Sequence, residues 1–308
     1  MTTPSAQTDR FVHDRLPPRD QWPELRYDLP ELRIADQANL VERLLDGAAA
    51  RGWADRPLLR SPQITFTYAE TRERVDRIAN YLVHELKLEP GNRVLLRGGN
   101  SIGMALSWLA AVKAGLIAVA TMPLLRATEL SKVIDKAQPV AAICDARLLQ
   151  ELEQAQQAFP ALQHVLRFNS PDDPSDLGQL VAHQAATFTA CPTSADDIAL
   201  LAFTSGTTGA PKAVVHTHRD VLAACEAWPR HVLRPTSDDI VTGSPPLAFT
   251  FGLGGLLLFP MWAGASIYYP DANYNPETMV RQMREQGVTT CYTSPTFYRQ
   301  LAPHMKAI

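Results

Sequence analysis

Residues 200–218 read LLAFTSGTTGAPKAVVHTH, an apolar run that changes abruptly into small, hydroxylated residues and then a single lysine, Lys212. The run starts at residue 197 as DIALLAF, and such a continuous apolar segment is typical of a strand buried on both faces of a parallel sheet. Ligands of open α/β sheets bind beyond the carboxyl ends of the strands. We therefore expect residues 204–212 to form a ligand-binding loop.

The loop combines three kinds of group that bind phosphate. Gly206 and Gly209 allow backbone N–H groups to turn toward one point, and Lys212 adds a mobile positive charge. Four hydroxyl groups add further donors, those of Thr204, Ser205, Thr207 and Thr208. Converging donors with one cation suit a polyphosphate, whose charge must be neutralised at a surface poor in water.

A flexible loop without a ligand would have a similar composition, but the preceding strand and the lysine favour the phosphate site. The loop does not follow the Walker A pattern, which has four residues between its glycines and a serine or threonine after its lysine. Here two residues separate Gly206 from Gly209, and Ala213 follows Lys212. A P-loop kinase or GTPase is therefore disfavoured.

The segments on either side of the loop predict an α/β fold. A helix ending in KAG at residue 115 is followed by LIAVATMP, ATELSKVIDKAQ and VAAICD, which read as strand, helix and strand. The same order returns after WAG at residue 264, with ASIYYP, NPETMVRQMREQG and VTTCYTSP. This alternation predicts two similar doubly wound parallel sheets with crossover helices.

We divide the chain into an extended N-terminal strap over 1–38, a first α/β unit over 39–190 and a second over 191–308. The polar stretch 169–197 marks the boundary between the two units. Within the first unit, residues 57–68 read as a short hairpin. Thr67, with Glu70 three residues on, predicts a capping box for the following helix.

Bulk composition excludes several classes of protein. Apolar residues make up 46% and charged residues 20% of the chain, as in globular proteins with a sizeable core. The net charge of −3 argues against nucleic-acid binding by bulk electrostatics, and four scattered cysteines indicate buried thiols rather than disulfides. The start of the sequence lacks the apolar core of a secretory signal, so we expect a cytoplasmic protein.

Residues 240–270 carry no charge and are long enough to span a bilayer. Glycine and proline interrupt them, and SIYY near their end is β-branched and aromatic. A helix running into a buried strand explains this stretch better than a membrane span.

TSGTTGAPKAVVHTH, residues 204–218, resembles the phosphate loop of the AMP-forming acyl-CoA synthetases and their adenylate-forming relatives, which include firefly luciferase and peptide-synthetase adenylation domains. PLAFTFGLGG (246–255) and GVTTCYTSPTFYRQL (287–301) are similar to two further segments of that family. FVHDRLPPRDQWPEL (11–25), together with PPLAFTFGLGG (245–255), looks most like 2-aminobenzoate- or benzoate-CoA ligases.

The resemblance implies a reaction in two steps. A carboxylate attacks the α-phosphate of ATP, with Mg²⁺, to give an acyl-adenylate and pyrophosphate, and the thiol of coenzyme A then displaces AMP. It implies that Lys212 and Thr204 act in catalysis and that the loop residues named above bind the nucleotide. It also implies that Phe249, Thr250, Phe251 and Gly252 line the carboxylate pocket, whereas plain core packing is the other reading of the two phenylalanines.

Other readings remain open at the level of sequence. Acceptors other than coenzyme A, such as a carrier protein or oxygen, are compatible with these residues, as are a non-catalytic nucleotide-binding module and a homo-oligomer. His216 and His218 fit a helix start better than a metal site, because no third ligand is nearby, and we expect no protein-bound metal here. Family members continue beyond the position of Ile308, so we expect this chain to be an N-terminal fragment that cannot complete acyl transfer alone.

Overall fold

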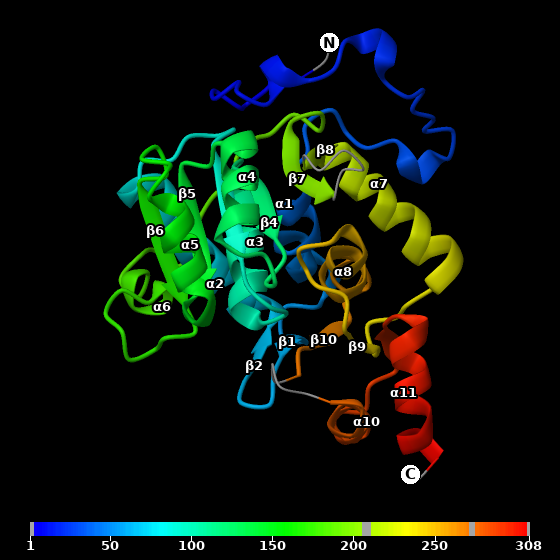
Figure 1. The fold of residues 1–308 in the computed structure, drawn as a ribbon. Coiled ribbons are helices and arrows are strands. Elements are labelled where there is room, and N and C mark those ends of the chain that lie inside the picture. The colour runs from blue at the N-terminus through cyan, green and yellow to red at the C-terminus, as the bar shows by residue number, and fades with distance from the viewer. Residues whose placement is uncertain (1–2, 205–210, 271–274, 307–308) are drawn as a thin grey trace.

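The computed structural model describes residues 3–204, 211–270 and 275–306. Its strands form a six-stranded sheet in the order β6-β5-β3-β4-β7-β8 and a five-stranded sheet in the order β11-β9-β10-β1-β2 (Figure 1). The strands are β1 (Pro57–Arg60), β2 (Thr65–Thr67), β3 (Arg93–Arg97), β4 (Ile117–Thr121), β5 (Ala141–Asp145), β6 (His164–Phe168), β7 (Ile198–Thr204), β8 (Lys212–Thr217), β9 (Ile240–Gly243), β10 (Ser266–Tyr268) and β11 (Thr290–Tyr292).

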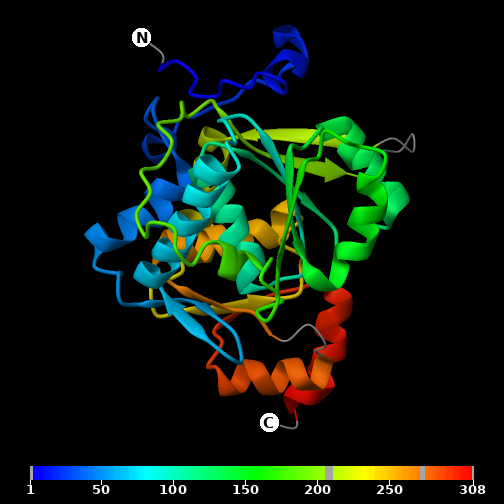
Figure 2. The same cartoon turned by 90° about the vertical axis from the view of Figure 1, so that its left-hand side faces the viewer.

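Helices connect and cover the strands (Figures 1 and 2). The α-helices are α1 (Leu40–Leu44), α2 (Tyr68–Asn80), α3 (Ile102–Lys113), α4 (Ala127–Ala137), α5 (Leu149–Gln156), α6 (Leu177–Leu180), α7 (His218–Trp228), α8 (Thr250–Leu253), α9 (Phe259–Ala263), α10 (Pro276–Glu285) and α11 (Pro295–Lys306). Two π-helical turns matter below, η7 (Pro229–Leu233) and η8 (Gly254–Leu258).

The prediction of two sheets built from parallel strands and crossover helices is confirmed. Within the six-stranded sheet β3, β4, β5, β6 and β7 run parallel, and only β8 is antiparallel to its neighbour. In the five-stranded sheet β1, β9, β10 and β11 run parallel, and β2 is the antiparallel edge.

The two sheets exchange strands across the predicted boundary at residues 190 and 191. The hairpin β1–β2 from the first part of the chain joins β10, and the hairpin β7–β8 from the second part joins β4. The division into two units stays a prediction, but neither unit contains a whole sheet. The main hydrophobic core accordingly includes Leu96 of β3, Trp108 of α3, Leu59 of β1 and Ile267 of β10, so one apolar interior serves both sheets.

Local signals in the sequence account for the ends of several elements. Thr67 accepts a hydrogen bond from the Glu70 amide, and the Glu70 carboxylate accepts one from the Thr67 amide, which is the capping box expected for α2. The uncharged stretch 240–270 is divided among β9, α8, η8, α9 and β10, as the helix-and-strand reading predicted. Among the described residues no helix has the length and apolar character needed to cross a membrane.

A buried ion cluster joins the helices beneath the sheets. The Lys113 ammonium, 1% exposed, lies 2.8 Å from a carboxylate oxygen of Asp46 and 2.5 Å from one of Asp76. Lys113 ends α3 and Asp76 belongs to α2, so the cluster ties these two helices together.

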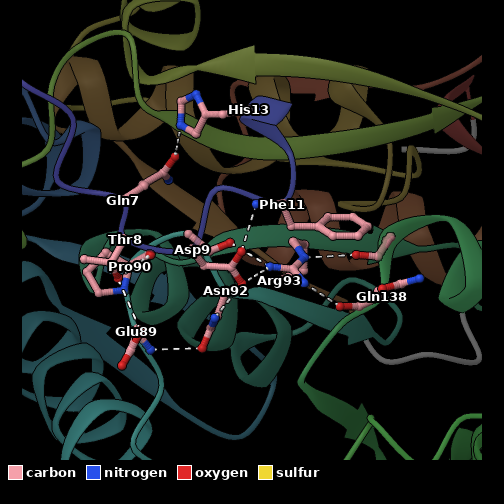
Figure 3. Close-up of polar contacts among 12 residues, drawn as sticks. Gln7, Thr8, Asp9, Phe11, His13, Glu89, Pro90, Asn92, Arg93 and Gln138 are labelled. Atoms are coloured by element: carbon pink, nitrogen blue, oxygen red, sulfur yellow. Dashed lines mark hydrogen bonds and ion pairs between the residues drawn. The ribbon is translucent and has the colours of Figure 1, made fainter. Parts of the chain in front are cut away.

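The N-terminal segment combines irregular backbone with three short 3-10 turns, His13–Arg15, Arg19–Gln21 and Pro30–Leu32, and it crosses the amino-terminal ends of the central strands (Figure 3). Its description as a strap over residues 1–38 stays a prediction. The Gln7 amide donates to the carbonyls of Gly115 and Ile198 and accepts from the Ile198 amide. It thereby bridges the starts of β4 and β7. Asp9 forms an ion pair with Arg93 at the start of β3.

Candidate functional site

The predicted phosphate loop lies between β7 and β8, which pair antiparallel. Thr204 ends β7 and Lys212 begins β8, and the two residues are directly paired across the strands. Both are exposed, and directly paired residues present their side chains on the same face. Ser205, Gly206, Thr207, Thr208 and Gly209 lie outside the described residues. The structure therefore brings together the first hydroxyl and the cation that the sequence singled out.

Packing along β7 shows which face of the sheet this pair occupies. Ala202 packs against the main core, whereas Phe203 packs against a second core formed with α4 and α5. Because side chains alternate along a strand, Thr204 shares the face of Ala202. Lys212 and Thr204 therefore project on the side of the sheet that carries α3, α8 and the five-stranded sheet (Figure 1).

The two histidines after the loop flank the residue that caps α7. Thr217 caps α7 in a capping box with Asp220, so His218 is the first helical residue, as expected. The His218 side chain is fully buried, and its Nδ1 accepts a hydrogen bond from the Leu40 amide at 3.1 Å. Burial lowers the pKa of His218 to about 3. Within the described parts of the chain no group of three His, Cys, Asp or Glu side chains could hold a metal ion.

The second predicted segment follows β9 and forms the short helix α8. Phe249 and Phe251 are 45% and 54% exposed, so neither side chain is part of the core of the described chain. Thr250 is also exposed. Gly252 is buried against the preceding turn, where an added methyl group would lie 2.0 Å from the Pro246 carbonyl oxygen. Glycine at this position is thus a packing requirement of α8.

An aromatic neighbour completes the surface of α8. The ring of Tyr292, at the end of β11, meets Phe251 edge to face with 6.0 Å between ring centres. Gly255 of η8 allows this arrangement, because a methyl group there would lie 2.9 Å from the Tyr292 ring. Burial raises the pKa of Tyr292, which keeps the phenol neutral. Tyr292 lies in a segment that the sequence analysis quoted without assigning it a role.

Arg97, the last residue of β3, and Asn100, which follows β3, hold the connections at this end of the strands. Neither side chain was predicted from the sequence to take part in the site. Arg97 is 1% exposed and donates to the carbonyls of Met122, Pro123, Leu125 and Leu148, so it fixes the connection between β4 and α4. Asn100 bonds to the connection that follows β9. Their acceptors are backbone groups distant in sequence, and no local pattern reveals such partners.

Comparison with known proteins identifies a matching family and several relatives. Residues 47–307 match the model of the family described as AMP-binding enzyme. A benzoate–CoA ligase of Thauera aromatica is 27% identical over 88% of this chain and 51% of its own length. A p-hydroxybenzoic acid–AMP ligase of Mycobacterium tuberculosis is 26% identical over 85% of this chain and 35% of its own length. The chain therefore spans about half the length of the first of these relatives and less of the second.

The fold is similar to that of a solved structure described as an anthranilate CoA ligase, AuaEII, in complex with anthranoyl-AMP. The two agree with a TM-score of 0.81 and 26% identity over 88% of this chain and 52% of that one.

Proposed function

This chain belongs to the AMP-binding enzyme family, and from this premise we propose that it is part of an ATP-dependent ligase that converts an aromatic or other apolar carboxylic acid into its coenzyme A thioester. The observation that most supports the proposal is the paired Thr204 and Lys212 on the same side of the sheet as the exposed Phe249 and Phe251. Polar groups for a phosphate chain and an apolar surface for an acid then face the same side of the sheet, which a mixed anhydride between the two requires.

In the first step an oxygen of the carboxylate attacks the α-phosphorus of ATP. The bond from that phosphorus to the oxygen bridging the α- and β-phosphates breaks, and pyrophosphate leaves with the electron pair. Lys212 and the Thr204 hydroxyl would bind the oxygens on which this charge collects, together with Ser205, Gly206, Thr207, Thr208 and Gly209. A preorganised donor at such a position contributes about a hundredfold to a thousandfold in rate.

The acid would lie against α8. The exposed rings of Phe249 and Phe251 offer an apolar wall, and aromatic rings pair favourably edge to face, as Phe251 and Tyr292 already do. The names of the relatives, benzoate–CoA ligase and p-hydroxybenzoic acid–AMP ligase, support an aromatic acid as the substrate. We therefore assign Phe249, Thr250, Phe251 and Gly252 to the acid pocket.

In the second step the sulfur of coenzyme A attacks the acyl carbon, and AMP leaves. Mg²⁺ would accompany ATP as the substrate complex. An adenylate-forming enzyme with another acceptor is the second candidate, because one relative is named as an acid–AMP ligase rather than a CoA ligase.

Exchange of labelled pyrophosphate into ATP, measured with the whole protein and a panel of benzoates and fatty acids, tests the proposal. We expect exchange that depends on an aromatic acid and falls at least about a hundredfold in Lys212→Ala. Lys136→Ala, which removes an exposed lysine from α4, is the matched control and should leave exchange unchanged. Equal exchange by the two variants, or none with any acid, would refute the assignment. Supplying coenzyme A and a carrier protein separately distinguishes the acceptors.

A further inference from the structure

Asn100 connects the two sheets at the site. It follows β3 of the six-stranded sheet, and its partners belong to the connection after β9 of the five-stranded sheet. The Asn100 side-chain amide donates to the Pro245 carbonyl at 2.8 Å, and its carbonyl accepts from the Leu247 amide at 2.8 Å. A side-chain amide is suited to this position because it donates and accepts at once. The two bonds fix both sides of Pro246.

The segment fixed in this way determines where α8 lies. The Phe249 amide donates to the Pro246 carbonyl at 2.9 Å, and the Leu253 amide donates to the Phe249 carbonyl at 2.8 Å. Gly252 packs directly on the same Pro246 carbonyl. A continuous series of backbone contacts therefore leads from Asn100 to the helix that carries the two exposed phenylalanines.

We propose that Asn100 is a positioning residue that sets the orientation of α8 and thereby the affinity for the acid. The inference rests on the proposed function in so far as α8 binds the acid. Asn100 itself does not contact the substrate in this scheme. It acts through Pro245 and Leu247, which hold Phe249 and Phe251 in the orientation in which Tyr292 supports Phe251.

The other end of β3 provides a matched comparison. Asn92 is half-buried like Asn100, and it too accepts one backbone bond, from the Glu89 amide, and donates one, to the Asp9 carboxylate (Figure 3). These partners lie at the amino-terminal end of the strand, away from α8. Replacing either asparagine by alanine removes one accepted backbone bond and one donated bond beside an end of β3, so a general loss of stability would appear in both variants.

Hydrogen exchange of the 308-residue chain tests the positioning without reference to catalysis. In Asn100→Ala we expect the Leu247 amide to exchange about tenfold faster, because its acceptor is gone, while Asn92→Ala leaves it unchanged. Unaltered exchange at Leu247 in Asn100→Ala, or equal acceleration in both variants, would overturn the inference. Asn100→Asp keeps the acceptor for the Leu247 amide but replaces the donor to the Pro245 carbonyl by a carboxylate oxygen, so it tests the bond to Pro245 separately if Asn100→Ala does not fold.

Pyrophosphate exchange by the whole protein tests the consequence. Asn100→Ala should raise the KM for the acid about tenfold and change the KM for ATP less than about twofold, while Asn92→Ala changes neither. A rise in both KM values would show a merely structural role and overturn the inference. Absence of acid-dependent exchange in the wild-type protein would instead overturn the proposed function, and hydrogen exchange would still decide whether Asn100 holds α8.

Discussion

The buried histidine at the start of α7 should make the fold sensitive to mild acid. His218 Nδ1 accepts the Leu40 amide proton, so the neutral ring carries its own proton on Nε2. Nε2 has no hydrogen-bond partner among the described residues, and the ring is fully buried. A second proton would break the bond to Leu40 and place a charge in an apolar interior at the positive end of a helix. Burial accordingly lowers the pKa of His218 to about 3.

The size of the effect follows from the difference between the folded and unfolded states. Between the ordinary value of 6.5 and about 3, the unfolded chain binds a proton at His218 that the folded chain does not. The stabilisation that the neutral His218 ring provides is therefore complete above pH 6.5, and it is lost as the pH falls toward about 3. Each pH unit within that window changes the free energy of unfolding by about 1.4 kcal/mol. At about pH 5 the loss is about 2 kcal/mol.

Urea unfolding at about pH 7 and about pH 5 measures this loss. His218→Asn keeps an oxygen acceptor for the Leu40 amide but does not titrate, so we expect its loss on acidification to be about 2 kcal/mol smaller than that of the wild type. His183→Asn replaces an exposed histidine and should behave like the wild type. If His218→Asn loses as much stability on acidification as the wild type, the reasoning about the buried ring is wrong.

Two substitutions test the packing on which the site depends. Lys113→Met leaves Asp76 buried without its cation, and we expect the free energy of unfolding in urea to fall by about 3–5 kcal/mol; an unchanged midpoint would contradict the role of the ion cluster. Gly252→Ala places a methyl group 2.0 Å from the Pro246 carbonyl oxygen, so α8 must move. We expect Gly252→Ala to speed hydrogen exchange in α8 and to weaken binding of the acid by about tenfold or more. Unchanged binding of the acid would show that the backbone around Pro246 accommodates the methyl group without moving α8.

The sequence predicted best those features that depend on neighbouring residues. The capping box of Thr67 and Glu70, the start of α7 after Thr217, and the alternation of helices and strands all arise from short-range hydrogen bonding and from the periodicity of apolar residues. The prediction of two sheets is confirmed for the same reason, since each crossover helix packs on the strands beside it.

The exchange of strands between the sheets could not be predicted in this way. Pairing of β1 with β10 joins residues more than two hundred positions apart, and nothing in residues 57–60 distinguishes one parallel neighbour from another. The sequence analysis also assigned no strand to residues 212–217. β8 is a half-exposed antiparallel edge, so it lacks the continuous apolar run that revealed β7.

At the site, the sequence identified the residue types and the structure supplied their surroundings. Lys212, Thr204, Phe249 and Phe251 were recognised because they lie in short motifs. Arg97, Asn100 and Tyr292 instead contact groups distant in sequence, and an isolated arginine or asparagine at a strand end carries no pattern that predicts such contacts.

The exposure of the two phenylalanines on α8 is itself an argument for a ligand surface. The helix continues into η8, where Leu256 and Leu257 are almost completely buried, so this part of the chain readily buries apolar side chains. Burying a phenylalanine is worth about 1.5–3 kcal/mol, and the folded chain forgoes about half of that at each position. Because Gly252 and Asn100 hold α8 in the orientation that leaves these rings in water, the free energy forgone in folding becomes available when an apolar acid covers them. A site built in this way should discriminate against small polar acids, since those cannot remove the rings from water.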